Sequence, residues 1–147
     1  MTGQLNDAQI DYVLSSQLVG RIGCGTSDRH YIFPVAYVFH EGSIYIHSKE
    51  GLKLKLLREN PNVCFQVDNI ETMTNWRSIL IWGKYEELKE EKEQIAALQI
   101  LRNQFEPFNI SETILPDLTE HYSFHKSLRA IAYRIKILEK SGRYEKS

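Results

Sequence analysis

The sequence predicts a mainly β (α+β) domain in which six antiparallel strands form a barrel with peripheral helices. Most of the candidate strands follow one another closely between residues 18 and 87, and the segments with helical periodicity are few. The regular alternation of strand and helix that a doubly wound parallel sheet requires is absent. The chain has 147 residues, 42% of them hydrophobic and 25% charged. These values are typical of one globular domain, which we expect to span residues 1–147.

Three helices are expected: one after Asn6, one over Gly51–Asn60 and one over Glu90–Phe105. Asn6 and Gln9 have the spacing of a capping box, and Ile10, Val13 and Leu14 share one face of the helix that follows. This first helix should end near Ser16. Proline residues follow the other two helices and predict where they stop.

The six expected strands are Leu18–Cys24, Arg29–Phe39, Ser43–Ser48, Val63–Asp68, Arg77–Glu86 and Arg129–Leu138. Both faces of the second strand are apolar, so we expect it to be covered on both sides. Pro34 lies within it, and because proline donates no hydrogen bond it indicates an edge, a bulge or a break. At a break, free backbone groups could bind a flat ligand; a simple edge strand is the alternative. The polar tail 139–147 should fray.

Composition excludes several classes of function. The 18 basic and 19 acidic residues give a formal net charge of −1, which argues against a nucleic-acid-binding protein with a large basic face. Cys24 and Cys64 have no closely spaced partners, so neither a disulfide framework nor a zinc site is indicated. No signal-peptide pattern is present, and no apolar run approaches the roughly 18 residues of a membrane span. We therefore expect a soluble, cytoplasmic protein.

The most informative candidate site is the segment from His47 to Lys53, where a strand ends and a helix begins. The free N–H groups of a helix start attract phosphate. Lys53 falls between Leu56 and Leu57 on the apolar face of the expected helix. Two interpretations remain open: Lys53 meets an anionic ligand, or its ammonium extends to the surface.

Arg77 and Ser78, at the start of the fifth strand, offer a planar guanidinium and a hydroxyl that suit a phosphate. An ordinary arginine at a strand end is the alternative. Residues 106–127 are irregular and aromatic, and we interpret them as a lid. Its candidate residues are Phe108, His121, Tyr122, Phe124 and His125. The two histidines have helical spacing but no evident third ligand, so no metal site is expected.

Several segments together resemble a known family. They are Ile32–Val38, Gly42–Ser48, Gly51–Lys53, Leu57–Phe65, Trp76–Ile79 and Ile135–Arg143. No single segment is specific, but their order and spacing resemble the pyridoxamine 5′-phosphate oxidase-like split-barrel flavoproteins, nearest the branch of the nitroimidazole-resistance proteins. The resemblance covers about half of the chain densely.

The resemblance implies a six-stranded split barrel that binds FMN and works as a homodimer, with two flavins at the subunit interface. It implies that the backbone of Pro34, Val35, Ala36 and Tyr37 runs beside the flavin ring. It also implies that the phosphate is held by His47, Ser48 and Lys53, joined by Arg77 and Ser78. The oxidase itself carries a basic residue where this chain has Leu52, which argues against oxidation of pyridoxamine phosphate.

We therefore predict an FMN-dependent oxidoreductase of a small molecule such as a nitro compound or quinone, with NAD(P)H as the electron donor. One alternative is a haem-binding barrel in which His47, His121 or His125 is an axial ligand. Another is a flavin-binding protein without turnover. A small barrel is filled by its own side chains, so we expect the flavin outside it and a second copy of the chain completing the site.

Overall fold

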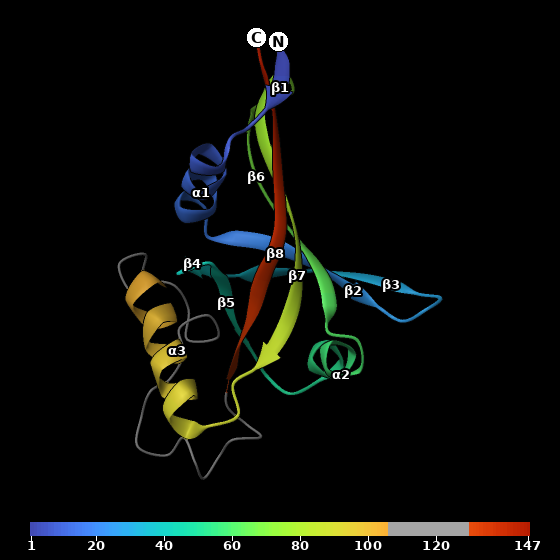
Figure 1. Ribbon diagram of the computed structural model, residues 1–147, viewed down its shortest axis with the longest axis vertical. Coiled ribbons are helices and arrows are strands. Elements are labelled where there is room, and N and C mark those ends of the chain that lie inside the picture. The colour runs from blue at the N-terminus through green and yellow to red at the C-terminus, as the bar shows by residue number, and fades with distance from the viewer. Residues whose placement is uncertain (106–129) are drawn as a thin grey trace.

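The computed structural model describes residues 1–105 and 130–147 (Figure 1). The elements are β1 (Thr2–Gln4), α1 (Asp7–Ser16), β2 (Val19–Gly25), β3 (His30–Ala36), β4 (Val38–His40), β5 (Ser43–Ser48), α2 (Leu52–Glu59), β6 (Asn62–Thr72), β7 (Asn75–Glu87), α3 (Glu91–Phe105) and β8 (Ile131–Lys146). All eight strands join one antiparallel sheet in the order β3-β2-β6-β7-β8-β5-β4, and β1 pairs with β8. The predicted class, antiparallel β with peripheral helices, is confirmed, but the described residues form eight strands in place of the six expected.

The sheet curls because its two outermost strands come from one stretch of chain. β3 pairs with β2 and β4 pairs with β5, yet only Tyr37 separates β3 from β4. The Tyr37 hydroxyl donates a hydrogen bond of 2.7 Å to the Leu14 carbonyl, and its N–H bonds to the Leu18 carbonyl at 3.1 Å. Its ring meets Phe65 edge-on, with the centroids 5.2 Å apart. Tyr37 is therefore a fixed corner at which the chain changes partner strands.

The concave side of the sheet holds the main hydrophobic core. Alternate residues of the strands point into it, and α1 contributes Ile10, Val13 and Leu14. Each of these fully buried aliphatic side chains contributes roughly 1.5–3 kcal/mol. α3 packs Leu98, Leu101 and other apolar residues against β4, β5 and β8 in a second cluster. No helix in the described part of the chain is long and apolar enough to cross a membrane.

Two sequence predictions need correction in detail. The single strand expected over 29–39 is divided at the Tyr37 corner into β3 and β4, because apolar alternation continues through the bend. The expected fraying of the tail is wrong: β8 continues to Lys146, between β1 and β7. The backbone of Lys146 also exchanges two 2.8 Å hydrogen bonds with Met1. Pairing of this kind uses backbone groups, so polar side chains at the end of a strand do not oppose it.

The capping box of the first helix is confirmed. Asn6 Oδ1 accepts from the Gln9 N–H at 2.9 Å, and Gln9 Oε1 accepts from the Asn6 N–H at 2.8 Å. α1 ends at Ser16, as expected. The turn between β4 and β5 is formed by Glu41 and Gly42, both with positive φ, as in the tight turns that join antiparallel strands.

Candidate functional site

The outer edge of β3 offers backbone groups that no strand of the described residues uses. Two backbone hydrogen bonds mark the ends of the β2–β3 ladder: the Tyr37 N–H donates to the Leu18 carbonyl, and the Thr26 N–H donates to the Arg29 carbonyl. Because bonded and non-bonded pairs alternate along an antiparallel ladder, the backbone groups of Ile32, Pro34 and Ala36 point away from β2. Pro34 thus lies where no donor is needed, which confirms its interpretation as an edge-strand residue.

Lys53 lies in the first turn of α2 and reaches toward β3. Its ammonium nitrogen is 5.4 Å from the centroid of the Phe33 ring, within the range of a cation–π contact. The side chain is half-buried, and no carboxylate of the described residues pairs with it. Burial lowers the pKa of Lys53, while the nearby Cys24 thiol acts in the opposite direction. The Lys53 ammonium thus lies beside the Phe33 ring. Its binding to an anionic ligand stays a prediction.

Two buried hydroxyls lie close to the point where β5 ends. Ser48 Oγ and Tyr133 Oη have no hydrogen-bond partner of good geometry within residues 1–105 and 130–147. Burial raises the pKa of Tyr133, and the nearby Ser48 hydroxyl offsets part of this rise. The two hydroxyls therefore lie near each other, and a polar ligand or a water here would complete their hydrogen bonding. His47 precedes Ser48, and its Nδ1 is buried as well.

Sequence reasoning missed the surroundings of Lys53. Cys24 is buried, and it lies near Lys53 and Tyr133. Burial raises the pKa of the Cys24 thiol, Cys64 raises it further, and Lys53 lowers it. Tyr133 alternates in step with the apolar residues of its strand. The sequence therefore predicts a core side chain there and gives no sign of the buried hydroxyl.

Arg77 and Ser78 are not brought near Lys53 within one chain. β6 begins at Asn62, just after α2, and Arg77 pairs with Asn69, seven residues further along β6. At the usual rise per residue of a strand, Asn62 and Asn69 are about 23 Å apart. In Figure 1, the paired ends of β1 and β8 lie at the top of the molecule, whereas α2 lies in its lower half. As neighbours in a strand, Arg77 and Ser78 also point to opposite faces.

The surroundings of Arg77 and Ser78 differ accordingly. Arg77 borders a hollow of about 320 Å³ beside α1, next to Tyr12. The Ser78 hydroxyl accepts a hydrogen bond of 3.1 Å from Gln66 on the outer face of the sheet. One chain therefore offers two separate groups of candidate residues.

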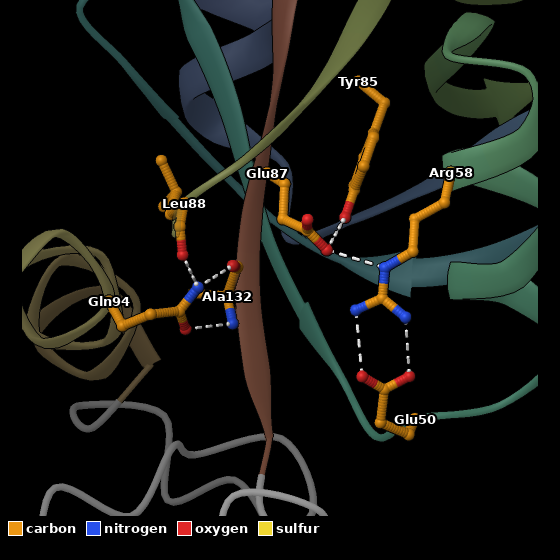
Figure 2. A network of polar contacts seen from close by, with 7 residues as sticks. All are labelled: Glu50, Arg58, Tyr85, Glu87, Leu88, Gln94 and Ala132. Carbon is orange, nitrogen blue, oxygen red and sulfur yellow. Dashed lines mark hydrogen bonds and ion pairs between the residues drawn. The ribbon is translucent and has the colours of Figure 1, made fainter. Parts of the chain in front are cut away.

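An ion-pair network holds the loop that joins β5 to α2 (Figure 2). Arg58, in the last turn of α2, donates two 2.9 Å hydrogen bonds from its terminal nitrogens to the Glu50 carboxylate. Its Nε lies 2.6 Å from Glu87 Oε1, at the end of β7. The Tyr85 hydroxyl also donates to this oxygen, at 3.3 Å. The two carboxylates raise the pKa of Arg58.

The outer face of the sheet carries an exposed apolar row. Gly23 pairs with Ile32 on one side and with Cys64 on the other, and Cys64 pairs with Trp82. Ile32, Trp82 and Leu138 are 74%, 42% and 62% exposed, and the row borders a hollow of about 640 Å³. Exposed apolar side chains therefore gather at this part of the outer face.

The predicted lid lies outside the described residues, because Phe108, His121, Tyr122, Phe124 and His125 all fall within 106–129. Its role stays a prediction. Among the residues that are described, no cluster of His, Cys, Asp and Glu could hold a metal ion.

Comparison with known proteins gives the family. A family model described as pyridoxamine 5′-phosphate oxidase matches residues 6–143. A relative from Rhizobium meliloti, an uncharacterized protein, is 30% identical over 76 residues, which are 52% of this chain and 50% of that protein. The match thus spans about half the length of that relative.

Solved structures agree with the family model. An FAD-binding protein from Mesorhizobium loti is 25% identical, with a TM-score of 0.75 and 98% of each chain covered. A proposed 5-nitroimidazole antibiotic resistance protein from Bacteroides thetaiotaomicron is 18% identical, with a TM-score of 0.75 over 98% of this chain and 87% of that one. Since the family model covers nearly the whole sequence, this chain is a member of the pyridoxamine 5′-phosphate oxidase family.

Proposed function

We propose that this protein binds FMN at the open edge of β3 and acts as a flavin-dependent oxidoreductase of a small molecule. The observation that carries the proposal is Lys53: a half-buried cation, without a carboxylate partner among the described residues, that faces the strand with the free backbone edge. Such a cation calls for an anionic ligand. The name of the Mesorhizobium loti protein, an FAD-binding protein with the same fold, supports a flavin as that ligand.

The groups present suit the two ends of a flavin nucleotide. The edge of β3 offers the Ala36 N–H as a donor and the Pro34 and Ile32 carbonyls as acceptors, the mixture that a flat heterocycle with ring nitrogens and carbonyls requires. For the phosphate, Lys53 supplies positive charge and Ser48 a hydroxyl. Gly51, the N-cap of α2, has no side chain to cover the free N–H groups of the first turn.

When bound, FMN supplies the hydride and electron transfer. The chain's own contribution is to bind the phosphate and to orient the ring along β3. NAD(P)H as donor, and a nitro compound or quinone as acceptor, complete the proposal. We assign no catalytic acid or base, because no titratable side chain beside the edge of β3 is marked out for that role within residues 1–105 and 130–147.

We further propose that a second copy of the chain completes the site. The apolar row through Ile32, Cys64, Trp82 and Leu138 provides a surface for it, since a stable interface needs about 800 Å² from each partner with an apolar centre. In such a homodimer, Arg77 and Ser78 of the partner subunit could join Lys53, which they do not approach within one chain.

The first experiment is the absorption spectrum and mass of whatever remains bound after gentle purification. A two-banded flavin spectrum with the mass of FMN is expected, and the mass separates FMN from FAD. Bleaching by NADH or NADPH supports an oxidoreductase, whereas a bound flavin that is not reduced favours the binding protein without turnover. An intense Soret band would overturn the proposal in favour of haem, and a protein that takes up no flavin at all would also contradict it.

The second experiment tests the site. Lys53→Ala should weaken FMN binding while the melting temperature stays close to that of the wild type. The matched control is Lys55→Ala, because Lys55 is exposed on the same helix. Equal FMN affinity in wild type and Lys53→Ala would remove Lys53 from the site.

A further inference from the structure

The loop between β5 and α2 is short, and the side chain of Glu50 ties it to Arg58 of α2. Only residues 49–51 separate Ser48, the last residue of β5, from Leu52, the first of α2. Gly51 makes no side-chain cap, and the space around its Cα is open. The proposed phosphate ligands Ser48 and Lys53 flank this loop, so their separation depends on what fixes it.

Arg58 fixes it from two directions. Its terminal nitrogens clasp both oxygens of Glu50 in the loop, and its Nε binds Glu87 at the end of β7 (Figure 2). The loop is thereby tied both to the last turn of α2 and to the sheet. The planar guanidinium is required for this, because a lysine ammonium cannot make two parallel bonds to one carboxylate while a third nitrogen serves another.

The same network has an electrostatic consequence. Arg58 is paired with two carboxylates, so the three side chains carry a net charge of −1 and offer no free cation to an anion. The guanidinium is therefore not available to bind phosphate directly. Arg58 can therefore affect phosphate binding only indirectly, by fixing the position of the β5–α2 loop.

We propose that Arg58 is a positioning residue for the phosphate end of the flavin: through Glu50 and Glu87 it holds the β5–α2 loop so that Ser48 and Lys53 face one anion together. This inference rests on the proposed function and deepens it. It separates recognition of the phosphate, which depends on the loop, from recognition of the ring, which depends on the edge of β3.

The test compares FMN with riboflavin, which has the same ring and no phosphate, by fluorescence titration of the flavin-free protein. Arg58→Gln should weaken FMN binding about tenfold, the scale on which loss of a supporting contact acts, and leave riboflavin binding unchanged. Glu87→Gln, a near-isosteric change, should act in the same direction. Arg58→Lys should restore only part of the loss. Lys55→Gln, on the exposed side of α2, should alter neither affinity.

The outcomes separate the inference from the proposed function. If Arg58→Gln and Glu87→Gln weaken both flavins equally, or neither, the positioning role is wrong although flavin binding stands. If the wild-type protein binds neither flavin, the proposed function fails and the phosphate role fails with it. Hydrogen exchange in flavin-free protein tests the loop directly: exchange in residues 49–53 should rise in Arg58→Gln while β7 is unchanged. Unchanged exchange there would contradict the inference.

Discussion

The side-chain amide of Gln94 pairs with both backbone groups of Ala132. Gln94 Nε2 donates to the Ala132 carbonyl at 2.7 Å, and Gln94 Oε1 accepts from the Ala132 N–H at 2.9 Å (Figure 2). Nε2 also donates to the Leu88 carbonyl at 2.7 Å. The last pair of β7 and β8 is Glu87 with Tyr133. The Gln94 amide binds the next residue of the β8 side, Ala132, as one more residue of β7 would, and so links this end of the sheet to α3. The side chain that does this is only 2% exposed.

Replacing Gln94 by alanine should therefore destabilise the fold strongly. Three backbone groups would lose their partners in a buried position, at a cost of roughly 2–4 kcal/mol in the free energy of unfolding. Urea unfolding followed by circular dichroism measures this. Gln99→Ala on the exposed side of α3 is the control and should change the free energy little. Equal stability of the two variants would show that the amide does not support β8.

Stability should fall at alkaline pH because of buried phenols. Burial raises the pKa of Tyr37, and burial and then Glu87 raise that of Tyr85 to about 12. The unfolded chain releases these protons near pH 10, the folded one only at higher pH. The stabilisation is thus complete below about pH 10 and is lost as the pH rises toward 12. Tyr37→Phe should make the decline between pH 10 and 12 shallower, whereas Tyr12→Phe, at a residue 72% exposed, should not.

FMN affinity should also depend on pH through Lys53. Its pKa is lowered by burial, so the ammonium loses its charge below the usual pH of 10.5. On the proposed function, FMN binding weakens as the pH rises through that lowered pKa, and riboflavin binding does not. Lys53→Arg keeps its charge throughout and should abolish the pH dependence. An identical pH profile in wild type and Lys53→Arg would assign it to another group.

Deleting residues 143–147 should lower stability although the segment is polar. Arg143, Tyr144 and Glu145 pair with β1 on one side and β7 on the other. Their removal should cost roughly 2–4 kcal/mol, the net worth of a few backbone hydrogen bonds, and thermal unfolding measures it. Removal of Ser147 alone is the control. If the shorter and the longer deletion melt at the same temperature, the end of β8 contributes nothing.

The sequence predicted those parts of the molecule that depend on local pattern. Alternation located the strands, and helical spacing placed Lys53 on the inward side of α2. Neither signal reports where a strand changes partners, which is why the alternation predicts one strand through Tyr37. A buried polar residue such as Gln94 has the sequence appearance of a surface residue, because its partners are backbone groups from other elements.

The candidate site also has a part that local sequence order predicts and a part that it does not. Lys53 and the edge of β3 come together through α2, which follows β5 directly, so motif order was informative. Arg77 was grouped with Lys53 only through the family resemblance, and the register of β6 and β7 separates them within one chain. Their roles in binding, and those of Pro34, Val35, Ala36, Tyr37, His47 and Ser48, stay predictions that the experiments above address.

The corner at Tyr37 makes the two borders of the sheet mechanically dependent on each other. A change in the angle between β3 and β4 has to be taken up at this single residue, because no other residue lies between the two strands. The Tyr37 hydroxyl is bonded to Leu14, in the last turns of α1. The corner that joins the two borders of the sheet is therefore anchored to α1.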